Sequence, residues 1–275
     1  MKRGLEARLD EEHFYGNFRS YYRFHPTAAR LNLLPGGMLE AIWQSHGCPT
    51  RFVILDLGCN EGDLSYGVYL LARREIPSQV HVKLLGVDID PILIGKAQSK
   101  YASENDCKFL CCDILGEYFD TTVKEYMAEN SIERFSLISL FSVTMWLHIN
   151  CGDDVFYSFL LKSCQLSLHL LIEPQPWKCY RHAKKRCLKN GIPLPEYLND
   201  DKRLSPTRIE DDIIEYISTL GLKSGEHWCL GREEWGRSLL LFHSDCNEVL
   251  VKYREDNKGS VSYAFRNDPA GLENV

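Results

Sequence analysis

Continuous apolar runs alternate with amphipathic stretches through the middle of the chain. Runs of apolar residues bounded by polar or glycine positions predict strands that are buried on both faces of a parallel sheet. They lie at residues 52–55, 80–88, 107–114, 134–141 and 168–173. Helix-like stretches lie between them at 64–71, 91–103 and 153–166. The alternation of strand and helix predicts an α/β fold with right-handed crossovers.

The pattern changes on either side of this alternation. Short helices are expected at 27–34 and 37–44, split by Pro35 and Gly36, and another helix is expected at 206–220. Two late apolar runs, at 226–230 and 237–243, are close enough to form an antiparallel pair. The charged residues 1–13 and the polar residues 245–275 predict a flexible N-terminus and a disordered tail around one domain at 14–244.

A glycine-containing turn follows the first predicted strand. It reads Asp56-Leu57-Gly58-Cys59-Asn60-Glu61-Gly62 and leads directly into a predicted helix. Glycine lets a cofactor approach the main chain, because a Cβ atom would block it. The third glycine of the dinucleotide fingerprint is missing, which argues against a nicotinamide-dependent oxidoreductase. An ordinary turn after a buried strand is the alternative.

Acidic residues stand at the ends of the next two predicted strands. Asp88 follows the second strand, where a carboxylate can accept hydrogen bonds from ribose hydroxyls. Asp90 is a suitable N-cap and Pro91 suits the first helical position, so a helix should start there. Asp113 ends the third strand. A surface carboxylate without a ligand is the alternative reading of Asp88.

Composition limits the location and the chemistry. The chain has 275 residues and a net charge of −6, and no apolar run approaches the ~20 residues of a membrane span. Its N-terminus lacks a secretory-signal pattern. The 11 cysteines include no Cys-x-x-Cys pair, which favours reduced thiols in a cytosolic or nuclear protein, and of the two we expect a cytoplasmic location. Cys111 and Cys112 should point to opposite faces of a strand, so we expect no metal site.

Two stretches combine features of nucleic-acid contact in spite of the negative net charge. Residues 14–24 hold six aromatic side chains interleaved with arginine, within a predicted N-terminal lid over 14–45. Residues 178–189 hold six lysines and arginines and no acid. A basic strip can contact an RNA backbone, and aromatic side chains can stack on unpaired bases. A lid packed on the sheet edge and a solvated helix face are the alternatives.

Two longer motifs follow the fourth and fifth predicted strands. They are Ser142–Asp153 and the run Glu173-Pro174-Gln175-Pro176-Trp177. With Tyr15–Phe18 and Asp56–Asn60, they resemble the bicoid-interacting family of RNA methyltransferases over about residues 14–244. The resemblance implies a Rossmann-like class I methyltransferase with a seven-stranded sheet and an antiparallel C-terminal hairpin. It also implies S-adenosylmethionine as the donor and the phosphate at an RNA 5′ end as the acceptor.

The family has two branches. Arg23-Phe24-His25-Pro26 and the compact length are similar to the branch that methylates 5′-monophosphate ends, including cytoplasmic histidine tRNA and microRNA precursors. The other branch caps the triphosphate end of a small nuclear RNA. A small-molecule or protein methyltransferase and a non-catalytic RNA-binding module are the remaining alternatives. We expect a monomer.

The resemblance also implies residue roles. Residues expected to hold the donor are Arg30, Asp56, Gly58, Asn60, Asp88, Ile89, Asp113, Ile114 and Phe141, the last replacing the methionine typical of the family. Residues expected to face the RNA phosphate are Tyr21, Arg23, His148, Lys178 and Arg237. His148 as a core histidine and Arg237 as a salt-bridge partner are the alternatives. A phosphate monoester has a second pKa of about 6, so it needs no general base to attack a methyl group.

Overall fold

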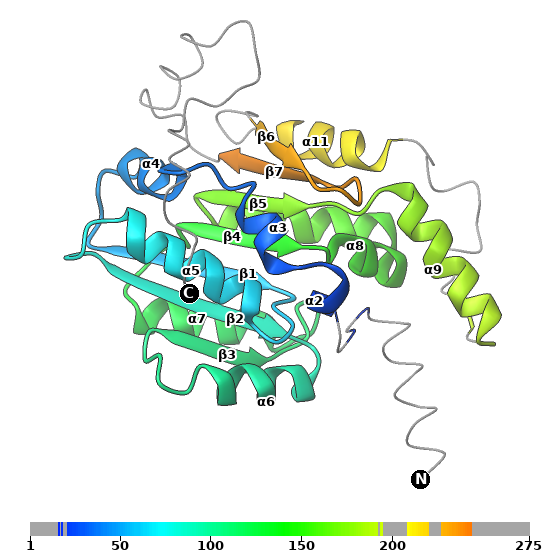
Figure 1. Ribbon diagram of the computed structural model, residues 1–275, viewed down its shortest axis with the longest axis horizontal. Helices are drawn as coiled ribbons and strands as arrows, with labels where there is room; N and C mark the ends of the chain where they lie inside the picture. The colour runs from blue at the N-terminus through cyan, green and yellow to red at the C-terminus, as the bar shows by residue number, and fades with distance from the viewer. Residues whose placement is uncertain are drawn as a thin grey trace, which may run out of the picture.

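Seven strands form one sheet in a computed structural model that describes Gly16, Phe18 and residues 21–191, 193–194, 208–219 and 227–243. The spatial order is β3-β2-β1-β4-β5-β7-β6 (Figure 1). The strands are β1 (Arg51–Leu57), β2 (His81–Asp88), β3 (Cys107–Cys111), β4 (Leu137–Phe141), β5 (His169–Glu173), β6 (His227–Arg232) and β7 (Ser238–His243). Strands β1 to β5 pair in parallel, and β7 runs antiparallel to both β5 and β6. The predicted mostly parallel sheet with a terminal hairpin is confirmed.

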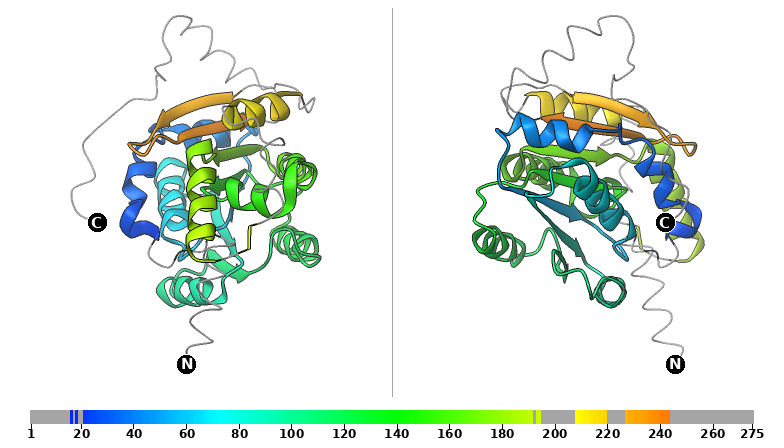
Figure 2. Two further views of the ribbon diagram at one scale, coloured as in Figure 1. Left: turned by 90° about the vertical axis from the view of Figure 1, so that its right-hand side faces the viewer. Right: turned by 60° about the vertical axis from the view of Figure 1, so that its left-hand side comes forward.

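Helices cover both faces of the sheet (Figure 2). They are α2 (Tyr21–Phe24), α3 (Thr27–Leu31), α4 (Met38–Ser45), α5 (Asp63–Glu75), α6 (Pro91–Lys100), α7 (Phe119–Glu129), α8 (Thr144–Leu166), α9 (Trp177–Lys189) and α11 (Ile209–Thr219). Helices α4, α5 and α6 pack on one face, and α7, α8 and α11 pack on the other. This arrangement leaves the carboxyl ends of the parallel strands as the edge available to ligands.

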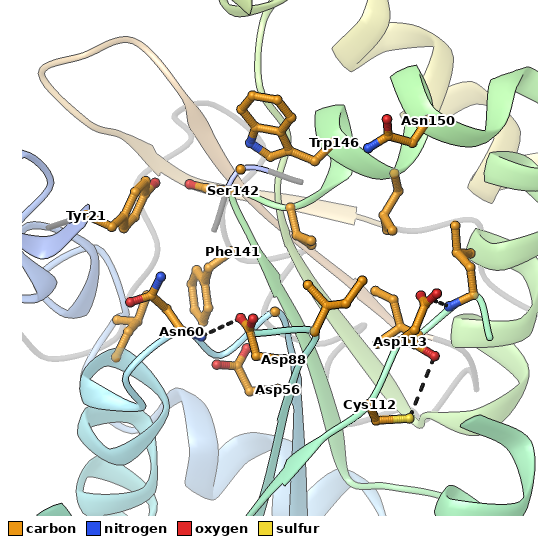
Figure 3. A pocket seen from close by; sticks show the side chains of 18 of the residues that line it. Tyr21, Asp56, Asn60, Asp88, Cys112, Asp113, Phe141, Ser142, Trp146 and Asn150 are labelled. Carbon is orange, nitrogen blue, oxygen red and sulfur yellow. Dashed lines mark hydrogen bonds between the residues drawn. The ribbon is translucent and has the colours of Figure 1, made fainter. Parts of the chain in front are cut away.

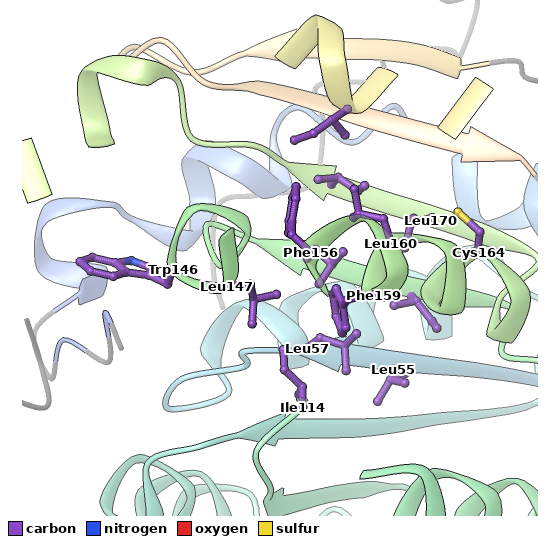
Figure 4. Close-up of a cluster of buried hydrophobic side chains, with 14 of the residues drawn as sticks. Leu55, Leu57, Ile114, Trp146, Leu147, Phe156, Phe159, Leu160, Cys164 and Leu170 are labelled. Carbon is purple, nitrogen blue, oxygen red and sulfur yellow. The ribbon is translucent and has the colours of Figure 1, made fainter. Parts of the chain in front are cut away.

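The alternation of side chains along β1 explains the two cores. Phe52 and Ile54 point to the face covered by α4, α5 and α6, whereas Val53 and Leu55 point to the other face. Figure 4 shows part of the second core, in which Phe156, Phe159 and Leu160 of α8 lie between β1 and β5. Each fully buried aliphatic or aromatic side chain contributes roughly 1.5–3 kcal/mol. The continuous apolar run follows from burial on both faces.

The helices differ from the sequence predictions in several places. Helices α2 and α9 lie in stretches for which no helix was predicted. Helix α7 was not predicted, since only Phe119, Val123 and Tyr126 of its residues are buried hydrophobic side chains. Helix α8 begins at Thr144, nine residues before the expected start at 153 (153 − 144), and non-helical dihedrals at Gly152 divide it. The segments predicted as a flexible N-terminus and a tail lie outside the described residues. No described helix combines the length and apolar character needed to cross a membrane.

Candidate active site

One cavity lies at the carboxyl ends of β1 to β4, and we call it the acidic cavity because three aspartates line it. The three are Asp56, Asp88 and Asp113. Figure 3 shows Tyr21 and Ser142 at one end of this cavity and Cys112 and Asp113 at the other. Its remaining lining residues include Gly58, Asn60, Ile89, Ile114, Phe141, Trp146 and Asn150. The strand ends thus meet at the place predicted from the sheet topology.

The glycine turn packs tightly against the sheet. Gly58 has a φ of +81°, and a Cβ atom there would lie 3.0 Å from Val143 Cγ2. The amides of Gly58 and Cys59 both donate to the carbonyl of Val87, at 2.8 and 3.0 Å. Asn60 has a φ of 53°, a region that asparagine tolerates better than most residues. The turn therefore presents main chain, rather than side chains, to the cavity.

Asp88 connects this turn to the next helix. Its carboxylate accepts from the amide of Asn60 at 2.8 Å (Figure 3). It also accepts from the amide of Asp90 at 3.0 Å. Burial raises the pKa of Asp88, and the two main-chain donors oppose that shift. One carboxylate thus fixes both loops that border the acidic cavity.

Asp56 stabilises the same edge of the sheet, at the end of β1. Its carboxylate is buried and accepts from the hydroxyls of Ser65 and Ser139, the latter at 2.6 Å. Burial raises the pKa of Asp56 to about 6, against the effect of both hydroxyls. These bonds anchor the end of β1 to α5 and β4.

A buried ion network lies beside the acidic cavity. Arg30 donates through Nε to Glu173 Oε2 at 2.7 Å, and both side chains are fully buried. Arg237 Nη1 donates to Glu173 Oε1 at 3.2 Å and to Ser142 Oγ at 2.5 Å. Burial alone would raise the pKa of Glu173, but the two guanidinium groups hold it below its usual value. Two cations thus share one firmly ionised carboxylate.

Tyr21 links this network to α2. Its hydroxyl accepts from Arg30 Nη2 at 2.7 Å and from Arg237 Nη1 at 3.0 Å. Burial, followed by the charge of Glu173, raises the pKa of Tyr21, so the phenol stays neutral near pH 7. The N-terminal helices are thereby tied to the sheet edge by charge-assisted hydrogen bonds.

A second cavity adjoins the first, and we call it the basic cavity after Lys178, Arg186 and Arg237. It is also lined by Phe18, Tyr21, Phe24, His25, Ser142, Met145, Trp146, Gln175, Cys179, His182 and Trp235. Three residues, Tyr21, Ser142 and Trp146, line both cavities. Carboxylates therefore line the acidic cavity and cationic groups line the basic cavity, and the two cavities share one wall.

The basic side chains are held in place by aromatic and main-chain partners. Lys178 Nζ donates to the carbonyl of Trp235 at 2.6 Å. The Arg186 guanidinium lies 5.1 Å from the ring centre of Phe18 and 5.7 Å from that of Trp146. Such cation–π contacts orient a guanidinium and leave its N–H edge available for an anion.

The structure brings together most of the predicted site residues. Every predicted donor residue except Arg30 lines the acidic cavity. Tyr21, Lys178 and Arg237, predicted to face the phosphate, line the basic cavity. Arg30 lies behind the cavity wall, where it holds Tyr21, Ser142 and Glu173. In this structure Arg30 positions wall residues, and its predicted contact with the donor stays a prediction.

Two predicted phosphate contacts are not placed at the basic cavity. Arg23 is exposed on α2 and lies outside the lining of both cavities. His148 is buried, with Nδ1 2.9 Å from the Tyr180 hydroxyl and Nε2 2.8 Å from Asp153 Oδ1. Burial lowers the pKa of His148 despite the neighbouring Asp153. The ring packs in the core, because its position on α8 turns it toward α9 and Phe156, and its contact with the phosphate stays a prediction.

His25 and Trp235 were not predicted. His25 lines the basic cavity, and its ring centre lies 4.8 Å from that of Trp235. Burial lowers the pKa of His25 to about 4, helped by the charges of Arg237 and Arg30. The signal for His25 was present in the Arg23–Pro26 motif. Trp235 lies in the β6–β7 turn, which the sequence pattern did not connect to the site.

The sheet order, together with a glycine turn that presents main chain beside acidic strand ends, defines a class I methyltransferase. A solved structure of WbdD shares the fold, with a TM-score of 0.50, 17% sequence identity, and coverage of 78% of this chain and 40% of that one.

The chain belongs to the bicoid-interacting protein 3 (Bin3) family, whose model matches residues 135–244. It is 35% identical over 241 residues to a pre-miRNA 5′-monophosphate methyltransferase of Danio rerio, covering 83% of this chain and 91% of the relative. It is 33% identical over 264 residues to an RNA 5′-monophosphate methyltransferase of Homo sapiens, covering 89% and 88% respectively. The family expected from the motifs is confirmed, and with it the methyltransferase class.

Proposed function

We propose that this enzyme transfers a methyl group from S-adenosylmethionine to an oxygen of an RNA 5′-monophosphate. The observation that carries the proposal is the wall of Tyr21, Ser142 and Trp146, which the acidic and basic cavities share. A cationic donor and an anionic acceptor can meet across this wall. The names of the relatives from Danio rerio and Homo sapiens support the same substrate class.

The acidic cavity suits the donor. Its sulfonium carries a positive charge, and the carboxylates of Asp56 and Asp88 provide a negative environment at the strand ends. Asp88 is available to the ribose hydroxyls, and Asp113 lies at the far end, where the adenine amino group would fit. Gly58 and Asn60 provide the main-chain surface against which the donor lies.

The basic cavity suits the terminal phosphate. Arg30 and Arg237 outnumber the single firmly ionised carboxylate of Glu173, so the buried network carries excess positive charge toward Tyr21 and Ser142. Arg237 and Lys178 can bind non-attacking phosphate oxygens through charge-assisted hydrogen bonds. The excess charge disfavours a neutral acceptor such as a small apolar molecule.

The reaction needs no enzyme base. A phosphate dianion oxygen attacks the methyl carbon as the carbon–sulfur bond breaks, and the electron pair stays on sulfur. The products are neutral S-adenosylhomocysteine and a methyl phosphate monoanion, so charge balances without proton transfer. The enzyme contributes alignment at about 3 Å and exclusion of water. Neutral His25 is available as a hydrogen-bond partner rather than as a proton acceptor.

We further propose that the substrates are small RNAs, such as histidine tRNA or microRNA precursors, and that a cytoplasmic monomer acts on them. Phe18, with the Arg186 guanidinium against its ring, provides an aromatic side chain on which the first base can stack. Light scattering of the purified protein gives its molar mass in solution and tests whether it is a monomer. Imaging of the tagged chain in cells tests its location.

The deciding experiment compares one RNA sequence with a 5′-monophosphate, a 5′-triphosphate or a 5′-hydroxyl end. We expect labelled methyl transfer to the monophosphate and at least about tenfold slower transfer to the triphosphate, because two further phosphates would move the first nucleoside away from Phe18 when the terminal phosphate lies beside Arg237. We expect no transfer to the hydroxyl, which has no phosphate to bind there. Faster transfer to the triphosphate would assign the capping reaction instead. Absence of donor binding in a calorimetric titration would assign a non-catalytic RNA-binding module.

A further inference from the structure

Three histidines converge at the end of the sheet opposite both cavities. His169 begins β5 and His243 ends β7, and the antiparallel register places them directly opposite each other. His46 is the C-terminal cap of α4, which lies at the same end of the molecule (Figure 1). One ring nitrogen from each of the three lies within 4.8 Å of the other two. Glu173 of the active site lies at the other end of β5.

The cluster is buried and close-packed. His169 is fully buried, His243 is buried, and His46 is partly exposed. His46 Nε2 lies 3.1 Å from His169 Nδ1, and the ring centres of His169 and His243 lie 4.3 Å apart. Among the described residues, His169 Nε2 is buried without a hydrogen-bond partner. The close pair of His46 Nε2 and His169 Nδ1 is the one that a single ion could bridge.

We propose that His46, His169 and His243 bind one divalent transition-metal ion, with zinc as the best fit. Imidazole nitrogens suit zinc, and zinc–nitrogen bonds of about 2.0–2.1 Å in a tetrahedron place ligand nitrogens roughly 3.3–3.4 Å apart. The 3.1 Å between His46 and His169 is near that spacing, and the third nitrogen needs a small side-chain adjustment. Water would complete the tetrahedron from the partly exposed side of His46.

The ion would act as a structural tie. It would join α4, from the N-terminal part of the chain, to β5 and β7 at a distance from the reaction. The charge of Arg134 reaches His169 and opposes a cation there, so binding should be weaker than at a site of four thiolates. Hydrogen bonding among neutral imidazoles alone is the competing account of the cluster.

The full chain, stripped of metal by a chelator and kept reduced, is titrated with Zn²⁺ against a competing indicator and separately with Co²⁺. We expect one equivalent of Zn²⁺ to bind and to raise the melting temperature. Co²⁺ should give visible d–d bands without the near-ultraviolet charge-transfer band of a thiolate ligand. That second probe matters because exposed thiols such as Cys48 and Cys229 can bind metal adventitiously.

Variants distinguish metal binding from hydrogen bonding among neutral imidazoles. His46→Gln, at the least buried ligand, and His243→Gln should each weaken Zn²⁺ binding at least about tenfold. His81→Gln, at an exposed position on β2, should leave it unchanged. Affinity for S-adenosylmethionine should survive in His46→Gln, which shows that the variant is folded and separates this proposal from the proposed function. Absence of a bound equivalent, unchanged binding in both ligand variants, or a thiolate band would overturn the proposal.

Discussion

Asp88 has the most consequential contacts of any single residue at the donor end. Its two carboxylate oxygens each hold one amide, from Asn60 and from Asp90, and the side chain still lines the acidic cavity. An asparagine at this position keeps the shape but has a single acceptor oxygen. One of the two loops would then lose its anchor.

We expect Asp88→Asn to weaken S-adenosylmethionine binding about 10–100-fold, because a charge-assisted hydrogen bond contributes about 1.5–3 kcal/mol. Calorimetric titration measures the effect. Asp154→Asn, on the exposed side of α8, is the matched control and should bind the donor normally. Equal affinity in the two variants would show that Asp88 does not organise the donor site.

Glu233 is a buried carboxylate near the ion network. Neither of its oxygens has a hydrogen-bond partner among the described residues, and Oε1 lies 4.0 Å from Arg30 Nε. Burial, with the nearby charge of Glu173, raises the pKa of Glu233 to about 7. A raised carboxyl pKa contributes stability below the unfolded value of about 4.5, and that contribution is lost as pH rises toward 7.

Between pH 5 and pH 8, the free energy of unfolding of Glu233→Gln should therefore fall by about 1 kcal/mol less than that of the native protein, after allowance for solvent screening. Chemical denaturation at both pH values gives the free energy of unfolding. The neighbouring Glu234→Gln change, at an exposed position, is the control. If the native protein and Glu233→Gln lose the same stability over this range, Glu233 ionises as an ordinary carboxylate.

At the scale of elements, α9 supplies the largest concentration of positive charge beside the site. It carries six lysines and arginines and no acid over Trp177–Lys189. Its buried side, formed by Tyr180, Ala183 and Cys187, fixes which residues face outward. Arg186 faces the basic cavity, while Lys184 is half-buried and Lys185 is exposed. The helix can therefore follow an RNA backbone away from its 5′ end.

Replacing Lys184, Lys185 and Arg186 by alanine should weaken RNA binding and reduce its salt dependence, because each lost phosphate contact lowers the slope by about 0.7 for single strands. Binding titrations at several salt concentrations measure this, and donor affinity should not change. Lys124→Ala, at an exposed position on α7, is the control. RNA affinity that is unchanged at every salt concentration would refute a role for α9.

The elements also show what a sequence pattern can specify. The apolar runs located every described strand within a few residues, because strands buried on both faces are mostly apolar, with few polar exceptions such as Ser139 in β4 and Asp56 in β1. Helix α7 was missed because its three buried hydrophobic residues are interspersed with six polar or charged ones, a methionine and an alanine. Eight of the residues that the family resemblance assigned to the donor line the acidic cavity, at or just after the ends of strands. Trp235 and the histidine cluster were not found, because only the folded hairpin brings them to their neighbours.

His148 shows that the sequence pattern does not predict which way a single side chain points. Its motif follows β4 at the correct edge, yet α8 begins at Thr144 and turns the ring into the core. The chain direction places a residue at an edge, but the rotation of a helix decides which way its side chain points. Arg30 is similar, since burial beside Glu173 depends on how α3 packs.

At the scale of the whole molecule, the net charge of −6 conceals a strong asymmetry. Carboxylates face the donor space, and guanidinium and ammonium groups face the adjoining one. This arrangement attracts a cationic donor and an anionic acceptor to opposite sides of a shared wall. It also implies that the acceptor must arrive already ionised, because none of the described groups at the wall is suited to remove a proton.

The rate of methyl transfer should therefore follow a single ionisation with a pKa of about 6, that of the acceptor phosphate. A pH–rate profile under single-turnover conditions tests this, and the rate in D₂O should match that in H₂O once the pKa shift is allowed for. His148→Gln should leave the pKa of the profile unchanged, since this ring lies in the core. A second ionisation belonging to the enzyme would show that a base takes part.

Strand β7 is the last described strand in the chain, yet it lies inside the sheet between β5 and β6. During synthesis, the edge of β5 that pairs with β7 stays unpaired until more than sixty further residues have emerged, since 238 − 173 = 65. Such a long wait for a pairing partner slows folding and exposes an aggregation-prone edge. Arg237 immediately precedes β7, so the same late event completes the anion site. The nascent chain therefore cannot bind its RNA acceptor at this site before β7 pairs with β5. Methyl-transfer activity should then appear only once the sheet has folded completely.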